Sequence, residues 1–384
     1  MTGDPRFRLP APQGGATDLL VIAGEHSGDE HAARLVSGLL ARRPGVRIAA
    51  LGGPRLAAAG AQLLYDRTSV SVVGLGEVLR NLSYFRALIR ATVQWIGEHR
   101  PRAVCFVDNS GVNLRIAREL RLAGISSRGG GSVRTLYYIS PQIWASRAAR
   151  RFDMARNLDA LAVIFPFEVA CYADTGLDVA FVGHPFMAPD YSPPVRHDPA
   201  GPVLLLPGSR PKAVALILPA LLEGYREFAI GSPGRGAVVL YPSEEIRRVV
   251  EAAGIPADVR LLKRGECVAA GAVLTSSGTM SMHCALAGIP GAIAYCTDPL
   301  TYLLGRWIVQ IPYLGIANII LGESMYPEYI QEQATAAALA RELLSCVSDA
   351  ARRARTAAQS AQLRAMLANP PGADESGWLA ANLP

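Results

Sequence analysis

The first segment of the sequence that could do chemistry is Gly24-Glu25-His26-Ser27-Gly28-Asp29, which directly follows an apolar run ending at Ala23. Backbone amides at a turn of this kind can receive an anion or a sugar oxygen. The spacing is not the GxGxxG of a dinucleotide site, and no suitably placed acidic residue marks a dinucleotide ribose. The alternative is a structural turn, in which Asp29 caps a helix that begins near it.

A second candidate is Asp108, which stands at the carboxyl end of the apolar run 103–107 and opens the segment Asp108-Asn109-Ser110-Gly111-Val112-Asn113. A carboxylate at the end of a buried strand is costly unless it is solvated or partnered. Such a residue usually belongs to a site or caps a helix. A catalytic role and a capping role for Asp108 therefore both stay open at this point.

Two further turns have the composition of phosphate cradles. Pro207-Gly208-Ser209-Arg210 follows the apolar run 203–206, and Ser276-Ser277-Gly278-Thr279 follows the run 272–275. Small residues let the backbone approach a diphosphate, Arg210 offers a fork of donors, and amides at a helix N-terminus favour anions. Two such turns indicate a nucleotide site more strongly than either alone, although each is also compatible with a purely structural turn.

The elements that must position these residues are short apolar runs that alternate with segments of helical length. Strands are predicted at 18–23, 47–51, 103–107, 134–139, 160–164 and 179–182, and the pattern restarts at 203–206, 236–240, 259–262, 272–275 and 291–294. Strands separated by helices favour parallel βαβ units. The predicted fold class is α/β, with two Rossmann-like, doubly wound domains facing a cleft where ligands bind outside the carboxyl ends of the strands.

The domain boundaries follow from shifts in composition. We predict a disordered leader at 1–17, an N-terminal domain at 18–190, a second domain at 201–345 and a helical tail at 346–384, within an Ala/Arg/Leu-rich stretch that starts at residue 335. The stretch 267–297 has no Asp, Glu, Lys or Arg. Glycines and a proline interrupt it, so it is interpreted as two buried strands flanking a helix rather than as a membrane span.

Composition limits the partners. Half of the 384 residues are hydrophobic, which excludes wholesale disorder. The net charge is +6, and all but two of the 38 basic residues are arginine, which permits anionic partners. The sequence has no run of Lys or Arg and no recognised nucleic-acid module, so no nucleic acid is expected. The six cysteines are scattered, which predicts no zinc site or disulfide framework. No signal peptide is evident, so a cytoplasmic location is expected.

These motifs together resemble the lipid A disaccharide synthase family, a family of GT-B glycosyltransferases. The resemblance also includes GGPRL, VVGLGEVL, YYISPQIWASR, FPFE, GHP and IPYLGIANIIL, and it runs in order from about residue 18 to 365. It implies inverting, metal-independent transfer of 2,3-diacylglucosamine from a UDP-sugar donor to an acylated sugar phosphate acceptor, with release of UDP and no cofactor. It also implies a homodimer with exchanged C-terminal segments, peripheral on the anionic inner-membrane surface.

The resemblance assigns roles to single residues. Asp108 matches the candidate general base, and Glu25 is placed beside it as a second catalytic residue. Ser27 and Asn113 are assigned to the acceptor side. The nucleotide and diphosphate are assigned to Gly208, Ser209, Arg210, Ser277, Gly278, Thr279, His283, Asn318 and Gln331.

The sequence departs from the family pattern at His26, in the segment 110–113 and at three positions of the second domain. His283 stands where the family has the glutamate that holds the nucleotide ribose, Ala213 lies where a glutamate follows the LPGSR turn, and Glu323 replaces an arginine. His283 either contacts the ribose or is a packed helix residue. Two alternatives follow: a divergent protein that acts on another nucleotide sugar, by transfer or epimerisation, or a non-catalytic membrane-associated binding protein that lost the donor site.

A helix that could meet the membrane is predicted near residues 78–90. Apolar residues recur there at helical spacing, interleaved with arginines: Val78, Leu79, Leu82, Phe85, Leu88 and Ile89 with Arg80, Arg86 and Arg90. Such a helix can lie on an anionic membrane. The alternative is a helix packed on its own sheet, and residues 302–308 form a second apolar stretch of this kind.

Overall fold

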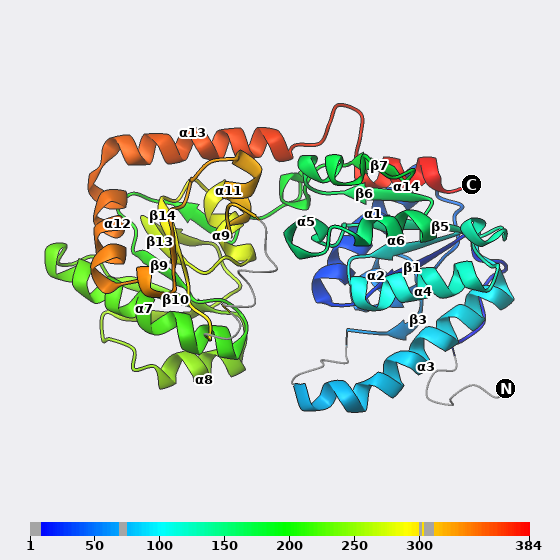
Figure 1. Ribbon diagram of the computed structural model, residues 1–384, viewed down its shortest axis with the longest axis horizontal. Helices are drawn as coiled ribbons and strands as arrows, with labels where there is room; N and C mark the ends of the chain where they lie inside the picture. The colour runs from blue at the N-terminus through cyan, green and yellow to red at the C-terminus, as the bar shows by residue number, and fades with distance from the viewer. Residues whose placement is uncertain (1–8, 69–74, 299–301, 303–310) are drawn as a thin grey trace. The chain divides into compact units, whose positions relative to one another are not determined.

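The structure is a computed structural model, and it describes residues 9–68, 75–298, 302 and 311–384, without the side chains of 75–82 (Figure 1). The chain divides into two compact units. The first comprises Met1–Pro185 with Asn369–Pro384, and the second comprises Phe186–Ala368. Residues 346–368, expected in the tail, thus belong to the second unit, and only the last sixteen or so return to the first.

The first unit is built on a seven-stranded parallel sheet. The strand order is β3-β2-β1-β4-β5-β6-β7, and the strands are β1 (Leu19–Ala23), β2 (Ile48–Gly52), β3 (Gln62–Asp66), β4 (Ala103–Val107), β5 (Arg134–Tyr138), β6 (Ala160–Val163) and β7 (Asp178–Phe181). Every residue of β1 and of β4 is buried. These central strands are uninterrupted apolar runs because helices cover both faces of the sheet.

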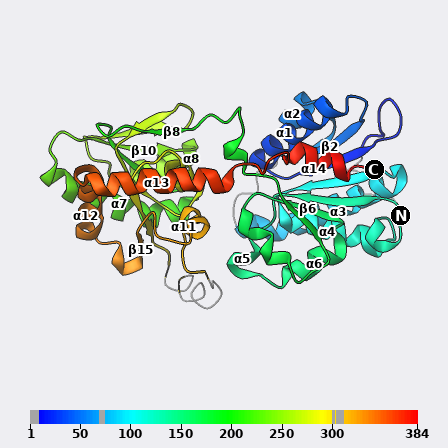
Figure 2. The same ribbon diagram turned by 90° about the horizontal axis from the view of Figure 1, so that it is seen from above.

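Helices lie on both faces of this sheet. Figure 2 shows α1 (His26–Arg42), α2 (Pro54–Ala58) and α14 (Glu375–Asn382) on one face, and α3 (Leu75–His99), α4 (Ser110–Leu122) and α6 (Arg150–Asn157) on the other. The short α5 (Ile143–Ser146) follows β5. The C-terminal α14 packs on α1, where Arg42 donates to Asp374 at 2.5 Å and to Ser376 at 3.1 Å.

The second unit repeats the architecture with six parallel strands. Their order is β11-β10-β9-β13-β14-β15, and they span β9 (Val203–Leu206), β10 (Ala237–Tyr241), β11 (Val259–Lys263), β13 (Ala272–Thr275), β14 (Gly291–Tyr295) and β15 (Glu328–Ile330). β8 (Val195–His197) and β12 (Val268–Ala270) form a separate pair. In Figure 1, α7 (Pro211–Gly231) and α8 (Glu244–Ala252) lie on one side of the sheet, and α9 (Thr279–Leu286), α11 (Ile316–Leu321) and α13 (Ala350–Leu367) on the other.

All eleven predicted strands are present, with ends that shift by a residue at most, and the uncharged stretch 267–297 does form β13, α9 and β14. The sequence did not predict β3, β8, β12 or β15. The helix predicted from residue 335 to 367 is two helices, α12 (Ala336–Ser348) and α13. The break falls at Asp349, whose carboxylate accepts from the amides of Ala351 and Arg352 and so starts a new helix.

Asp29 does not cap its own helix, contrary to one of the two interpretations of the first motif. α1 begins three residues earlier, at His26, and the Asp29 carboxylate accepts from the amides of Gly53 at 2.7 Å, Arg55 at 3.0 Å and Leu56 at 3.3 Å. Asp29 is buried and caps α2, so the GEHSGD segment ties the start of α1 to the end of β2.

The predicted amphipathic stripe on α3 is partly a core element. Leu88 and Ile89 are buried in the hydrophobic core of the first unit. The side chains of Val78, Leu79 and Leu82, and residues 303–308 of the second apolar stretch, lie outside the described residues. Across the described parts of the chain, no helix combines the length and the apolar character needed to span a membrane.

Candidate active site

The loops after β1 and β4 meet at the point where the strand order of the first sheet reverses. β1 and β4 are parallel neighbours, and the chain continues from them into α1 and α4, on opposite faces. Ligands of open α/β sheets bind in the crevice that such a reversal creates. The two loops touch: a Cβ on Gly24 would lie 2.0 Å from Asn109 Nδ2, so only glycine fits at position 24.

The backbone of Asp108 is held in an unusual conformation. Asp108 and Asn109 both have positive φ, at 48° and 45°, in the left-handed region that most side chains avoid. The Asp108 amide donates to Tyr138 O at 3.0 Å, and its carbonyl accepts from Tyr137 Oη at 2.5 Å and Asn113 Nδ2 at 2.8 Å. Asn113, predicted on the acceptor side, is fully buried and fixes this turn from beneath. Strain maintained in this way is typical of functional positions.

The Asp108 side chain lines a depression of about 300 Å³ with Ser110, Gln142, Arg147 and Arg150 among its walls. Burial raises the pKa of the Asp108 carboxyl above its ordinary value, and the negative charge of Glu25 raises it further, while a backbone hydrogen bond from Asn109 opposes the shift. A carboxylate with a raised pKa is a stronger base than one in water. The geometry thus gives Asp108 the properties of a proton acceptor.

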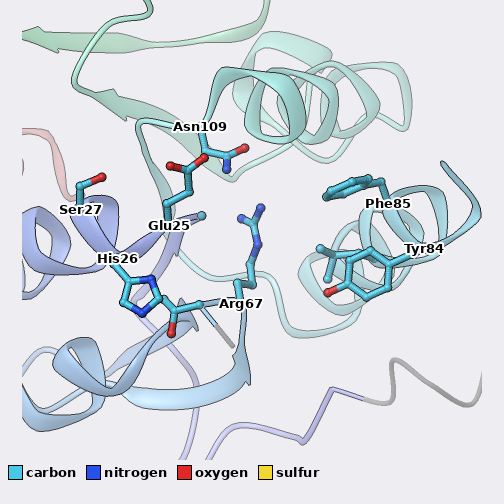
Figure 3. A pocket seen from close by; sticks show the side chains of 10 residues that line it. Glu25, His26, Ser27, Arg67, Tyr84, Phe85 and Asn109 are labelled. Atoms are coloured by element: carbon cyan, nitrogen blue, oxygen red, sulfur yellow. The ribbon is translucent and has the colours of Figure 1, made fainter. Parts of the chain in front are cut away.

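The neighbouring pocket, of about 480 Å³, contains the other predicted residues of this unit. Glu25 and Ser27 line it from the start of α1, together with Gly24, His26 and Asn109 (Figure 3). Its remaining walls were not predicted: Arg67 and Thr68 follow β3, and Tyr84, Phe85 and Leu88 come from α3. The sequence analysis did not predict β3. The one signal that could have drawn attention to Arg67 was its basic side chain, close behind the short run Leu63-Leu64-Tyr65.

In the second unit, the loops after β9 and β13 also meet where the strand order reverses. Gly208 has a φ of 114°, and a Cβ there would lie 3.3 Å from Ser276 Oγ. The Ser276 amide donates to Leu206 O at 2.8 Å, which joins the two turns. Each turn leads into a helix. α7 opens with Pro211, which has no amide hydrogen, whereas the first amides of α9, from Thr279, precede the hydrogen-bonded turns and can bind an anion.

The predicted diphosphate ligands are accessible at these helix starts. Arg210 is the N-cap residue of α7 and is exposed, with no ion pair among the residues that the structure describes. Ser209, Gly278 and Thr279 are exposed, and Gly208 and Ser277 are partly exposed. This arrangement of amides, hydroxyls and one guanidinium is suited to a diphosphate.

His283 is a packed helix residue. It is only 4% exposed, its ring stacks on Phe186 with centroids 4.1 Å apart, and its Nδ1 shares a hydrogen bond with Tyr191 Oη. Burial lowers the pKa of His283 to about 4, with a smaller contribution from the charge of Arg264, so the imidazole is neutral near pH 7.

Asn318 and Gln331 have their amide groups engaged within the protein. Asn318 is fully buried; its Nδ2 donates to Tyr326 O and Glu328 Oε1, and its Oδ1 accepts from the amides of Met325 and Tyr326. Gln331 bonds both the amide and the carbonyl of Thr297. Both side chains therefore fix loops at the end of the sheet. Within the described residues, no cluster of three or more His, Cys, Asp or Glu could hold a metal ion.

The fold, with a candidate site where the strand order reverses in each of the two sheets, defines a class of proteins. The glycosyltransferase of kitacinnamycin superposes with a TM-score of 0.58 at 15% identity, over 96% of this chain and 100% of that chain. The calicheamicin glycosyltransferase gives 0.53 at 16%, over 96% and 98%. A UDP-GlcNAc 2-epimerase from Neisseria meningitidis also gives 0.53, at 10%, over 95% and 98%. The fold is that of the GT-B glycosyltransferases, with two Rossmann-like domains, as predicted.

Sequence comparison narrows the class to one family. The family model for lipid-A-disaccharide synthetase matches residues 19–375. The lipid-A-disaccharide synthase of Geobacter metallireducens is 34% identical over 364 residues, which cover 91% of this chain and 92% of that protein. The enzyme of Nitrosococcus oceani is 34% identical over 349 residues, or 87% and 88%. The chain belongs to the lipid-A-disaccharide synthetase family and is a glycosyltransferase, which confirms the resemblance.

Proposed function

We propose that the protein transfers 2,3-diacylglucosamine from its UDP derivative to the 6-hydroxyl of 2,3-diacylglucosamine-1-phosphate, giving the β-1′,6-linked disaccharide and UDP. The observation that carries the proposal, within this family, is Asp108. Its carboxylate stands at the switch point of the first sheet, its backbone is fixed by three hydrogen bonds, and its pKa is raised. These are the properties expected of a general base that accepts the proton of a sugar hydroxyl.

In the proposed mechanism the first unit holds the acceptor. The acceptor hydroxyl loses its proton to Asp108 as it attacks the anomeric carbon in line, and the bond from that carbon to the diphosphate breaks with inversion. Glu25, which lines the adjoining pocket, is proposed to orient the acceptor by accepting from sugar hydroxyls. Its charge also favours protonation of Asp108 at the moment of transfer, because it raises the pKa of that carboxyl.

The second unit is proposed to hold the donor and to take up the charge of the leaving UDP. The donors come from the turns after β9 and β13: the amides that open α9, the hydroxyls of Ser209, Ser277 and Thr279, and the Arg210 guanidinium. Hydrogen bonds and helix dipoles arranged in advance stabilise the departing diphosphate. We propose that this set of donors serves in place of a metal ion.

The test of the proposal is a product assay combined with a titration. The purified protein is incubated with the diacylated UDP donor and the phosphorylated acceptor, and both UDP and disaccharide are quantified. The expected result is one UDP per disaccharide. Calorimetry should detect UDP binding that Arg210→Ala weakens by about 10-fold or more, as expected for a lost charge-assisted hydrogen bond, whereas the exposed Arg248→Ala should leave it unchanged.

Other outcomes of these assays would contradict the proposal in distinguishable ways. A protein that binds no UDP is a binding protein rather than a transferase. Epimerisation of a UDP-sugar, with no disaccharide formed, would show that the protein is an epimerase rather than a transferase. Release of UDP with a product that does not contain the acylated acceptor would support the proposed donor and contradict the proposed acceptor.

We also propose that the protein works on the anionic cytoplasmic face of the inner membrane. Between α3 and α4 lies a surface groove of about 670 Å³ whose floor includes Ile89 and Val93. It is lined by four exposed arginines that form no ion pair with any described residue: Arg86, Arg90, Arg115 and Arg118. Such a surface attracts anionic lipid headgroups at about 1 kcal/mol per residue.

Vesicle sedimentation tests this surface. Binding to vesicles with anionic phosphatidylglycerol should exceed binding to neutral phosphatidylcholine vesicles, and Arg115→Gln with Arg118→Gln should reduce it. Equal binding to both vesicles, or no effect of the double variant, would contradict the surface. We also propose the homodimer that the resemblance implies: light scattering of the whole protein should give the mass of two chains, and the mass of one chain would contradict it.

A further inference from the structure

The side chain of Arg67 is buried in the first unit, and one of its guanidinium nitrogens has no hydrogen-bond partner among the described residues. Arg67 follows β3, its amide donates to Gly52 O at 2.6 Å, and its side chain turns into the pocket at the start of α1. Figure 3 shows the guanidinium pointing toward the space between Glu25, Asn109 and Phe85. The residue is only 7% exposed, and its Nη1 is buried with no hydrogen-bond partner among the described residues.

This guanidinium is charged in spite of its burial. Desolvation lowers the pKa of Arg67 to about 10, against opposing contributions from Tyr84, Tyr65 and Glu25, so the group is still a cation at neutral pH. Glu25 contributes at a distance but makes no ion pair with it among the described residues. A buried charge without a paired group is strongly unfavourable, and proteins rarely retain one without a use for it.

A second feature of the same pocket also favours an anion. α1 is 17 residues long, and its N-cap residue, Glu25, makes no capping hydrogen bond with its side chain. The first backbone amide that the helix satisfies belongs to Asp29, so the amides of His26, Ser27 and Gly28 precede the hydrogen-bonded turns. His26 and Ser27 line the pocket, so the positive end of α1 and the Arg67 guanidinium border the same cavity and both favour an anion in it.

The remaining residues that line the pocket indicate the chemistry of the rest of the ligand. Tyr84, Phe85 and Leu88 form an apolar wall from α3, and Tyr84 Oη is bonded to Tyr65 Oη at 3.0 Å. Glu25 is exposed, so it can turn from an anion and accept from hydroxyls instead. A volume of about 480 Å³ is sufficient for a sugar ring with an anionic substituent. The ligand is thus anionic at one end and a hydroxylated, partly apolar body at the other.

We propose that this pocket binds the phosphate group of a sugar phosphate, with Arg67 as its bidentate partner and the first amides of α1 as further donors. The proposal rests on the proposed function, which supplies a sugar 1-phosphate as acceptor, and it deepens that function by naming the residue that selects for the phosphate. Arg67 offers parallel N–H groups that match two phosphate oxygens. The ring then extends from Arg67 toward the Gly24–Asn109 contact and the neighbouring Asp108.

Arg67→Met is the decisive variant, because methionine keeps an unbranched apolar stem at this position and removes the guanidinium and its charge. If Arg67 only supported the fold, its loss would lower the thermal midpoint. The proposal expects an unchanged or higher midpoint, because an uncompensated desolvation penalty disappears. Arg102→Met, at an exposed position outside both sites, is the matched control. Arg67→Lys retains the charge and should recover part of the binding.

The direct probe is glucosamine 1-phosphate, titrated by calorimetry into the whole protein without donor. The wild-type protein should bind it more tightly than glucosamine, and Arg67→Met should weaken that binding by about 10- to 100-fold, the range for a hydrogen bond to a charged group. Binding of glucosamine should not change. Equal affinity of the wild type and Arg67→Met for glucosamine 1-phosphate would overturn the proposal.

A kinetic measurement separates this proposal from the proposed function. With the acylated acceptor, Arg67→Met should raise KM for the phosphorylated form about 10- to 100-fold and leave the dephosphorylated form unaffected, so that the preference for phosphate disappears. If the wild type forms disaccharide and the variant retains the preference, the pocket assignment is wrong and the function stands. If the wild type forms no disaccharide while the calorimetric result holds, the function is wrong and the pocket stands.

Discussion

Replacing Asp108 with asparagine tests the proposed general base with little disturbance of the fold. The turn is fixed by main-chain groups: the Asp108 amide bonds to Tyr138 O, and its carbonyl accepts from Tyr137 and Asn113. None of these bonds uses the carboxylate. Asparagine has the same shape and is one of the few residues that tolerate positive φ, so the backbone at 48° should be retained.

The expected loss of rate follows from the role of the group. General base catalysis contributes about 10²- to 10⁴-fold, so Asp108→Asn should lower kcat by that factor, or by about 3 to 5 kcal/mol in activation free energy. KM should change little, because the amide still occupies the same space. The folded protein should not lose stability: burial raises the pKa of Asp108, so its ionised form is unfavourable in the native state near neutral pH.

The assay is UDP release coupled to disaccharide formation, measured across pH together with the thermal midpoint. Activity of the wild type should fall on the acid side as Asp108 becomes protonated, at a pH above the ordinary range for aspartate, since its pKa is raised. The residual activity of Asp108→Asn should lack that acid limb. A variant with native stability and undiminished kcat, or one that retains the same acid limb, would refute the assignment.

Three further predictions concern buried groups and packing. Burial raises the pKa of Glu168 to about 7 from 4.5, so stability should fall by up to about 3 kcal/mol as pH rises between these values, and Glu168→Gln should flatten that slope in denaturant titrations; parallel slopes would contradict it. The pKa of His283 is lowered to about 4, so stability should be complete above about pH 6.5 and fall by up to about 3 kcal/mol toward pH 4, a loss that His283→Gln should abolish. Gly24→Ala places a Cβ 2.0 Å from Asn109 Nδ2 and should cost about 1–3 kcal/mol of stability with reduced turnover, whereas Gly45→Ala, which meets nothing within 4 Å, should not.

The framework of the fold could be predicted because its central strands are buried on both sides. β1, β4, β9 and β13 are continuous apolar runs, and each ends in a turn whose composition differs sharply from it. The edge strands β3 and β15 were missed because they are only partly buried and mix polar with apolar residues. Arg67 depended on β3 for its position, so a basic residue in this place did not by itself assign it to the site.

The chemistry of single residues was less accessible, because a polar side chain in a motif can face a ligand or the backbone. Asn113 and Asn318 lie in segments that were assigned to substrate, and both direct their amides at main-chain groups. Their identity is therefore explained by the loops that they fix. Arg210 and Ser209 belong to the same kind of motif but are exposed at the start of α7. Only the hydrogen-bond partners separate the two cases.

The histidine at position 283 can be understood through its neighbours. A glutamate there would carry its charge beside Phe186 and Tyr191, in a site where burial, with a smaller contribution from the charge of Arg264, lowers the pKa of the imidazole to about 4. A neutral imidazole is accommodated because it stacks on Phe186 and shares a hydrogen bond with Tyr191. When Tyr191 donates to Nδ1, the ring proton is on Nε2, so His283 presents a donor where a carboxylate would present only acceptors. The histidine at position 283 is therefore explained by the packing of α9 against Phe186 and Tyr191.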